Sequence, residues 1–570
     1  MSYTINPNAK NRWARNADNT MDLSLETDAS SVYLDNGRTL EQEIGEGSMV
    51  SNVATVDNAM SKIIDGTLDG AYESLVFKGK SLVNIHPISY TISASGATTY
   101  FAGRDIDKTK IKSGTRYFLR LLDTDPTVCR AYFKPCNVNT ISFADINDKY
   151  AIFTTKSELT DSDFNNNKIH FYTNTSKTLE DVANTKIILC EYQDGMENWD
   201  IPYFEGICDV KMPILRNTGK NLFDGELIRG NISGGSGEDI NNAGFESKMC
   251  RTNYIKVTPG SNFTASIEGK YVIEKISQID KDKKFIATTE KNIPSVSIKL
   301  SNNTSFIRCV IKSSDSSEIT LDDVRNSNIQ FEESPTKTTY EPHKSNILRT
   351  SEEIVLREVG GVQDTYNPLT GEYVKRIGEV VITSAVAKSV IVLDKNVRAN
   401  ITMSALNGDS GTTKANNILS DKFYWSEANA RDIEGLRVNG NTLHWCVSRD
   451  KLTSQDLQGV NTWLQSNPIT VQYILAEPIT TIIKPSTMTP FAYQNGHVIV
   501  ESGYEGQSLL PTLEYSTVIN KTGLVENVAK TIQRQEKQLT MLEQMLIQNI
   551  INLDYNNTLL ALKNEMEEML

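Results

Sequence analysis

Basic residues are scarce relative to acidic ones in this chain. There are 58 Lys and Arg against 71 Asp and Glu, which leaves a formal charge of −13. A protein that holds nucleic acid regardless of its sequence needs a basic face to displace the counterions condensed on the phosphates. We therefore expect no nucleic acid among the partners. No apolar stretch approaches the roughly 18 uninterrupted residues of a membrane-spanning helix, so we expect no membrane insertion.

The N-terminus lacks a basic segment followed by an apolar one, and we therefore expect synthesis in a cytoplasm without a secretion signal. Cysteine and histidine are also sparse, at 7 and 5 of 570 residues, and no Cys-x-x-Cys pair occurs. We predict no disulfide framework, metal or cofactor. Cys190 and Cys309 lie in apolar runs and are interpreted as small apolar side chains on buried strands.

Sequence motifs typical of enzymes are missing as well. The chain has no Gly-x-Ser-x-Gly, no phosphate-binding glycine loop and no His-Glu-x-x-His, so we expect no enzyme. One Asp-x-Asp, in the segment Ile279–Phe285, resembles part of a calcium loop. No glycine or later bidentate Glu completes such a loop, and Asp and Lys often cluster where strands reverse. The segment therefore predicts a hairpin turn.

The chain consists mostly of short β-branched and aromatic runs separated by Gly, Asn, Asp, Ser and Pro. This texture predicts a mainly β protein of sandwich or jelly-roll domains, with expected strands at Ile85–Ile92, Tyr117–Leu122, Ile187–Tyr192, Ser305–Ile311 and Val471–Leu475. Helical periodicity occurs only near the ends. From Met49 to Ile63 apolar residues recur at spacings of 4, 3, 4 and 3, which predicts a short N-terminal helix.

An internal repeat divides the β region. The segment 179–191 matches 321–333 at an offset of 142 residues, and 111–117 resembles 257–263 at an offset of 146. Each unit is then about the size of one β-sandwich. A fainter third copy rests on Tyr473–Glu477 alone. Glu191 and Glu333 occupy equivalent positions, which favours a shared structural role.

Aromatic side chains are the candidate binding residues, because sugar rings stack on the faces of Trp and Tyr. Burial in a core is the alternative for each. Trp463 is expected on a helical turn packed against a sheet. The candidate carbohydrate-stacking residues, including one histidine beside a tryptophan, are Trp199, Tyr203, Tyr424, Trp425, His444 and Trp445.

The C-terminal tail has a strict seven-residue apolar repeat. Because an isolated helix drifts about 20° per heptad against such a repeat, the pattern favours a supercoiled assembly over a lone packed helix. Polar residues at the companion positions, such as Asn549 and Asn556, are typical of seams that select register and oligomer state. A monomeric helical hairpin is the alternative. The predicted oligomerisation seam is Val525, Ile532, Leu539, Leu546, Leu553 and Leu560.

Several segments together resemble tail-fibre, baseplate-appendage and receptor-binding proteins of tailed phages, and of phage-tail-like bacteriocins, that target Gram-positive bacteria. Ser31–Ile44 is similar to their particle-attachment region. The segments that resemble the frame of their carbohydrate-binding-module-like jelly rolls are 219–224, 254–260, 329–333 and 339–342. Residues 463–468 followed by 471–478 form another sequence motif typical of these proteins.

The resemblance and the repeat together imply an elongated multidomain chain. We expect an N-terminal particle-attachment region (1–47), a short helix and linker (48–73), β-sandwich 1 (74–215), β-sandwich 2 (216–348), a third β domain (349–516) and a C-terminal coiled-coil region (517–570). Fibres of this family are commonly trimeric, which implies a parallel homotrimer.

The function implied by the resemblance is that of a structural virion protein in a phage tail or baseplate. It would be a tail fibre or receptor-binding protein that contacts cell-surface polysaccharide and joins other tail proteins through its N-terminal region. Two alternatives stay open: a connector that binds no receptor, and a polysaccharide depolymerase, which needs paired carboxylates roughly 5–10 Å apart in a groove.

Overall fold

The structure is a computed structural model of the 570-residue chain. Its described residues are 4–5, 14–15, 21–22, 32–33, 50–56, 60–63, 67–86, 92–95, 100–105, 111–122, 129–133, 141–142, 150–164, 168–173, 186–199, 201–383, 387, 389–402, 418–423, 434–439, 442–485, 490, 492–519, 539–540, 543–544, 546 and 548. For several of the strands among them only the backbone is described.

The protein is mainly β, with antiparallel pairing between its named strands. Four of the five expected strands are confirmed, as β11 (Arg116–Leu122), β16 (Lys186–Glu191), β28 (Phe306–Ser313) and β41 (Ile469–Ile482). The fifth, Ile85–Ile92, includes residues outside the described set. Cys190 and Cys309 are buried on β16 and β28 as expected, and burial raises the pKa of both thiols.

The predicted N-terminal helix is wrong. Its residues form two strands, β5 (Val50–Val56) and β6 (Met60–Lys62). The segment of β5 contains Val, Ser, Asn and Thr, which have low helix propensity because of stiff or backbone-competing side chains. Strand pairing over the whole of β5 therefore outweighs an apolar spacing that also suited a helix.

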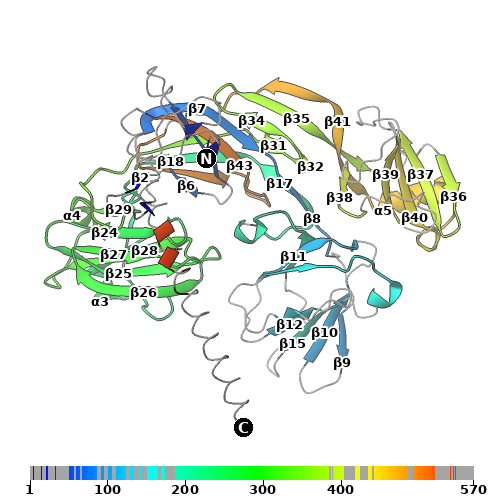
Figure 1. Ribbon diagram of the computed structural model, residues 1–570. Coiled ribbons are helices and arrows are strands. Elements are labelled where there is room, and N and C mark those ends of the chain that lie inside the picture. The colour runs from blue at the N-terminus through cyan, green and yellow to red at the C-terminus, as the bar shows by residue number, and fades with distance from the viewer. Residues whose placement is uncertain are drawn as a thin grey trace, which may run out of the picture.

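A central body, here called the hub, collects strands from distant parts of the sequence (Figure 1). Its seven-stranded sheet has the order β38-β41-β35-β34-β7-β43-β5. The remaining bounds in this sheet are Ile418–Ser420 (β38), Glu372–Ile382 (β35), Thr365–Asn367 (β34), Thr67–Lys78 (β7) and Thr512–Ile519 (β43).

Two smaller sheets complete the hub. One has the order β30-β18-β42-β6, with Ser345–Arg349 (β30), Pro213–Thr218 (β18) and His497–Ser502 (β42). The other has the order β31-β17-β8, with Val355–Leu356 (β31), Gly206–Lys211 (β17) and Ser81–Asn84 (β8). A turn joins Glu358–Val359 (β32) to Val362–Gln363 (β33). Apolar residues of all three sheets share one core, among them Phe77, Val210, Leu348, Val500 and Leu513.

The chain leaves the hub three times and returns each time, which produces three units around it (Figure 1). Unit 1 comprises β9 to β16, between β8 and β17. Unit 2 comprises β19 to β29, between β18 and β30. Unit 3 comprises β36 to β41, and its last strand continues into the seven-stranded hub sheet.

Units 1 and 2 have the same strand order, which supports the repeat. In unit 1 the sheets are β13-β12-β15-β10-β9 and β14-β11-β16; in unit 2 they are β26-β25-β28-β22-β19 and β27-β24-β29. Unit 2 has one additional short strand, Ile255–Lys256 (β23), which also pairs with β28. The other bounds in unit 1 are Ile92–Ser95 (β9), Tyr100–Asp105 (β10), Cys129–Phe133 (β12), Ile141–Ser142 (β13), Tyr150–Thr154 (β14) and Lys168–Thr173 (β15). Those in unit 2 are Leu227–Arg229 (β19), Met249–Thr252 (β22), Asn262–Ser266 (β24), Tyr271–Ile279 (β25), Phe285–Ile293 (β26), Ser295–Lys299 (β27) and Gln330–Glu332 (β29).

Unit 3 follows the same order with two strands fewer. Its sheet is β36-β37-β40-β39, and β38 pairs with β41 as β11 pairs with β16. The bounds are Ser389–Val392 (β36), Asn396–Thr402 (β37), Gly435–Asn439 (β39) and Thr442–Ser448 (β40). Residues 440 and 441 join β39 to β40, which leaves no space for the two additional strands. The third copy, which rested on Tyr473–Glu477 alone, therefore extends through a whole unit.

A short helix precedes the last strand in units 2 and 3. These are α4 (Leu321–Arg325) and α5 (Leu457–Ser466), whose N-caps Thr320 and Asp456 accept backbone N–H bonds. Trp463 lies on α5 and packs against the core of unit 3, as expected. The corresponding segment of unit 1, residues 179–182, lies outside the described residues.

An asparagine at the entrance of each of the first two units makes the same four hydrogen bonds. Asn84 Nδ2 donates to the carbonyls of Ile187 and Phe204, each at 2.9 Å, and its Oδ1 accepts from the N–H groups of His86 and Leu189. In unit 2, Asn221 Nδ2 donates at 2.9 Å to the carbonyls of Ile329 and Glu341, and its Oδ1 accepts from Phe223 and Phe331. Each asparagine thus connects the strand entering its unit to the strand leaving it.

The insertion of units into a hub corrects the predicted organisation. The boundaries expected after residues 73, 215 and 348 fall inside β7, β18 and β30. The units also do not follow one another in a line, as an elongated chain of domains implies, because each begins and ends at the hub. Local sequence could not reveal this, since the hub strands pair across hundreds of residues.

The predicted hairpin turn in the segment Ile279–Phe285 is confirmed. It joins β25 to β26, and Asp280 Oδ1 accepts from the N–H groups of Asp282 and Lys284 at 2.9 and 2.8 Å. The turn also contacts unit 1. There, Asp282 pairs at 2.7 Å with the guanidinium of Arg120, which is only 3% exposed.

Both chain ends are described only in parts. Near the N-terminus, Thr4–Ile5 (β1) pairs with Val32–Tyr33 (β4), and Ala14–Arg15 (β2) pairs with Met21–Asp22 (β3). Near the C-terminus, the described residues between 539 and 548 are helical. The coiled coil expected there stays a prediction.

We predict that Asn221→Ala lowers the free energy of unfolding by about 2–4 kcal/mol, because four backbone groups lose a partner and three of these hydrogen bonds are buried. The control is Asn253→Ala, at an exposed position beyond β22, where we expect a change within about 0.5 kcal/mol. Chemical denaturation of the full chain measures both. Equal stabilities of the two variants would contradict the proposed anchoring role.

Candidate functional site

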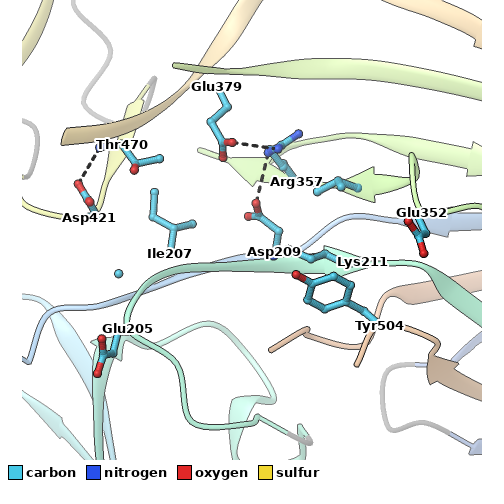
Figure 2. A pocket seen from close by; sticks show the side chains of 12 residues that line it. Glu205, Ile207, Asp209, Lys211, Glu352, Arg357, Glu379, Asp421, Thr470 and Tyr504 are labelled. Atoms are coloured by element: carbon cyan, nitrogen blue, oxygen red, sulfur yellow. Dashed lines mark hydrogen bonds and ion pairs between the residues drawn. The ribbon is translucent and has the colours of Figure 1, made fainter. Parts of the chain in front are cut away.

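A polar cavity of about 470 Å³ lies at the junction of the hub with unit 3 (Figure 2). We call it the hub cavity. Its walls come from β17, from residues between 352 and 357, from β35, from the turn after β38 and from the start of β41. The charged or polar side chains that line it are Glu205, Asp209, Lys211, Glu352, Arg357, Glu379, Asp421, Thr470 and Tyr504.

Arg357 joins two carboxylates at the wall of this cavity. Its Nε lies 3.3 Å from Asp209 Oδ2, and its Nη2 lies 3.3 Å from Glu379 Oε1 (Figure 2). Burial lowers the pKa of the guanidinium, but the two carboxylates outweigh this and hold it above its usual value. Arg357 therefore remains a cation between the two carboxyl groups.

Asp209 is the more deeply buried of the two carboxylates. Its carboxylate accepts hydrogen bonds from Ser81 Oγ at 2.6 Å and from Gln472 Nε2 at 2.8 and 3.0 Å. Gln472 Nε2 also donates to Glu379 at 3.0 Å. Burial raises the pKa of Asp209, and Arg357 and these donors offset only part of the increase.

The members of the cluster lie on different hub segments. Ser81 is on β8, Asp209 on β17, Arg357 between β31 and β32, Glu379 on β35 and Gln472 on β41. These strands lead into or out of units 1 and 3. Both carboxylates are bound to Arg357 and Gln472, so the geometry suits a structural junction better than an acid–base pair.

A second buried carboxylate, Asp364, lies nearby in the hub. It is fully buried and accepts three backbone N–H bonds, from Arg357, Arg376 and Ile377. Burial raises its pKa to about 6 even though these donors favour the charged form. Tyr373, whose hydroxyl donates to the carbonyl of Val355 at 2.7 Å, also has a pKa raised by burial.

The rim of the hub cavity is more open. Tyr504 is 42% exposed, and Lys211 Nζ lies 4.6 Å from the centre of its ring. At the other end Glu205 accepts a hydrogen bond from the hydroxyl of Tyr203 at 3.2 Å. The rim thus offers an aromatic face and several charged groups to a polar ligand.

A cleft of about 320 Å³ continues from the hub cavity between units 1 and 3, and Asp421 lines both. Unit 1 contributes Lys112, Glu191 and Tyr192, and unit 3 contributes Phe423. Glu191 pairs with Lys112, whereas Glu333 in unit 2 accepts from the N–H of Thr258 and lies 3.1 Å from His497. Since residues 112 and 258 are equivalent, the two glutamates contact the same position of the repeat.

Two of the predicted stacking residues are buried instead. Trp445 is fully buried in the core of unit 3, where its ring contacts Phe423 and Trp463. Trp199 is 8% exposed in the hub core, and Lys80 Nζ lies 4.2 Å from its ring centre. The stacking role predicted for these residues is therefore wrong, because each ring is covered by its own protein.

The other predicted stacking residues lie in different parts of the structure. Tyr203 is partly buried beside the hub cavity, through its bond to Glu205. His444 is half-buried on the face of β40 opposite the core of unit 3, and it does not line the hub cavity. Tyr424 and Trp425 lie outside the described residues. The candidates do not form one site.

Sequence reasoning missed the hub cluster, although a signal existed. Asp209 and Gln472 each interrupt an otherwise apolar strand, in Ile207-Cys-Asp-Val210 and Val471-Gln-Tyr-Ile474. A lone polar residue inside a buried strand needs a partner. The two lie 263 residues apart, however, so their mutual contact was not visible.

No cluster of His, Cys, Asp or Glu that suits a metal ion occurs among the described residues. Within the same residues, no helix has the length and hydropathy needed to cross a membrane. In comparisons with known proteins, no family model matches the chain and no curated protein shows significant similarity to it.

We predict that Arg357→Met lowers the free energy of unfolding by about 3–5 kcal/mol, because it leaves Asp209 as a buried charge without its cation. Arg349→Met, at an exposed end of β30, is the control and should cost less than about 1 kcal/mol. Chemical denaturation compares the two. A loss at Arg357 no larger than that at Arg349 would show that the cluster is not a structural junction.

A pH-dependent contribution is expected from Asp364. Its pKa of about 6 in the folded protein exceeds the value of about 3.9 expected in the unfolded chain, so the native state binds the proton more tightly. The resulting stability is complete below pH 4 and is lost as the pH rises through 6.

Asp364→Asn cannot titrate, so its destabilisation relative to the unmodified protein should be larger at pH 4 than at pH 7.5. The expected difference is up to about 3 kcal/mol. Denaturation of both proteins at the two pH values measures it, and the other titrating groups cancel in the comparison. A difference that does not change with pH would contradict this assignment.

Proposed function

We propose that the chain is a structural virion protein of a phage tail, baseplate or phage-tail-like particle, and that it binds host cell-surface carbohydrate. The observation that carries this proposal is the repetition of one strand order in three units around a hub. Combined with the sequence resemblance to tail fibres and receptor-binding proteins, it supports a scaffold that presents several β modules of jelly-roll type.

The arrangement of charges supports binding over catalysis. Two carboxylates at the wall of the hub cavity, Asp209 and Glu379, are both bound by Arg357 and Gln472. Such pairing stabilises the fold and leaves neither carboxylate available to protonate a glycosidic oxygen. We therefore place the receptor contact on a sheet face of the units, and the particle contact in residues 1–47.

A homotrimer is part of the proposal. Leu539 and Leu546, seven residues apart on the C-terminal helix, are 50% and 61% exposed in the single chain. Two leucine side chains of the strict heptad repeat are thus exposed to solvent in the single chain. Parallel association with two further copies would bury them in a coiled-coil seam.

We predict that the protein sediments at about three times its chain mass of 63.6 kDa, and that Leu539→Asp with Leu546→Asp reduces this mass. Gln544→Asp introduces the same side chain on the exposed helix at a position outside the seam, and should leave the mass unchanged. Analytical ultracentrifugation measures all three. If the unmodified protein is a monomer, the predicted coiled-coil seam is wrong and the monomeric helical hairpin is favoured.

The receptor-binding function is tested by incubating the full chain with host cells and with isolated wall polysaccharide. We expect binding to both without release of sugar. Released oligosaccharide would instead identify a depolymerase, and the absence of both binding and release would identify a connector.

A further inference from the structure

The outer face of the unit 3 sheet carries a cluster of basic and amide side chains. Along β37 and β40, residues alternate between the core, as with Ala399 and Trp445, and the opposite face. That face presents Asn400 beside His444 and His444 beside Arg437, in direct register across β37, β40 and β39. Cross-strand neighbours of this kind have Cβ atoms about 5 Å apart. Arg398 lies two residues before Asn400 on the same face.

Several polar atoms of this cluster are buried without a hydrogen-bond partner. They are Arg398 Nε, Asn400 Oδ1 and His444 Nδ1. No carboxylate in the described part of the chain pairs with Arg398 or His444. Buried polar atoms are usually satisfied. Arg251 Nε on the corresponding face of unit 2 also has no hydrogen-bond partner, so the difference between the two units is the carboxylate beside Arg251, for which Arg398 has no counterpart among the described residues.

The electrostatics of the face are positive. Burial lowers the pKa of His444, and the nearby guanidinium groups of Arg398 and Arg437 lower it further. Two guanidinium groups thus lie near His444 on this face, and an anion placed there would be attracted to them.

Unit 2 shows how the same fold neutralises this face internally. Its strands β22 and β28, which correspond to β37 and β40, carry Arg251 and Arg308 on the side opposite the core. Both guanidinium groups pair with Asp239, at 3.0 and 2.7 Å. Lys275, on the next strand, likewise pairs with Glu290 at 3.4 Å.

The neutralising carboxylate in unit 2 comes from an inserted hairpin. Asp239 lies on β21 (Asp239–Ile240), which pairs with β20 (Asn231–Ile232) in the long connection between β19 and β22. In unit 3 the corresponding connection, between β36 and β37, is residues 393–395, closed by a bond from Leu393 N–H to the carbonyl of Asn396. This short turn has no hairpin to place an acid over the face.

We infer that the outer face of the unit 3 sheet binds an anionic group, a phosphate or carboxylate, of a polysaccharide, in the place that Asp239 occupies in unit 2. Arg398 would contact the anion, since a guanidinium matches both oxyanions in geometry. Asn400 lies beside His444 on the same face, and its Nδ2 donates to Ser389 Oγ at 3.0 Å. Ile391, 41% exposed opposite Arg398, offers an apolar contact to the ring. This ligand class rests on the proposed function of receptor binding.

The test measures binding of the full chain to immobilised phosphorylated dextran, carboxymethyl dextran and neutral dextran by biolayer interferometry at one ionic strength. We expect binding to at least one anionic dextran and weaker binding to the neutral one. Arg398→Gln should reduce the anionic binding at least tenfold. Lys299→Gln removes one exposed positive charge from β27 of unit 2 and should change it less than twofold. The two anionic arms distinguish phosphate from carboxylate recognition.

A competition experiment keeps the inference testable if Arg398→Gln misfolds. Inorganic phosphate should displace the unmodified protein from phosphorylated dextran more strongly than chloride of equal ionic strength. Equal effects of Arg398→Gln and Lys299→Gln, or equal displacement by the two salts, would overturn the inference, because binding would then follow net charge alone.

Cell binding separates this inference from the proposed function. If the chain binds host cells but no anionic dextran, the receptor-binding proposal stands and the anion site is wrong. If Arg398→Gln weakens binding to anionic dextran but the unmodified chain does not bind host cells, the anion site stands and the proposed receptor role fails.

Discussion

The ion pair of Arg357 with Asp209 and Glu379 holds together hub segments that are far apart in the sequence. A buried cation between two carboxylates is stable only while all three are present, since each alone would be an uncompensated charge. Gln472 extends the network to β41 by donating to both carboxylates. The strands that enter and leave units 1 and 3 are therefore connected by one network of ion pairs and hydrogen bonds. The placement of these units depends on this network.

Insertion into a hub gives each unit two covalent connections to the centre. Asn84 and Asn221 reinforce this arrangement in units 1 and 2, because each binds both the entering and the leaving strand through four hydrogen bonds. The contact of Arg120 with Asp282 adds a direct link between these two units. A module fixed in this way presents its faces in a defined direction, which suits a protein that contacts a large surface.

Units 2 and 3 share a strand order but differ in how the basic side chains on the outer sheet face are paired. Unit 2 covers its face with a hairpin that supplies Asp239, and the guanidinium groups become part of the structure. Unit 3 has a three-residue turn at that place, and no carboxylate among the described residues pairs with Arg398 or His444. The length of one connection thus separates a structural ion cluster from a surface able to accept an external anion.

The sequence by itself determined the local features of the protein. It predicted the β class, four strands, the hairpin at Asp280, the helical turn at Trp463 and the repeat between the first two units. Such features depend on residues a few positions apart, where propensity and periodicity act directly. The stripe from Met49 to Ile63 was misleading because its spacing suited a helix, while long-range pairing of β5 with β43 decided the outcome.

Only the tertiary structure decided where the units attach and which side chains are available. Phe77 pairs with Leu513 in the hub sheet, a register that no local pattern encodes. Trp445 resembled a binding residue but fills a core, whereas its neighbour His444 faces outward, because adjacent residues of a strand point to opposite sides. The cluster around Arg398 depends on strand register and on a missing hairpin, and both are properties of the assembled sheet.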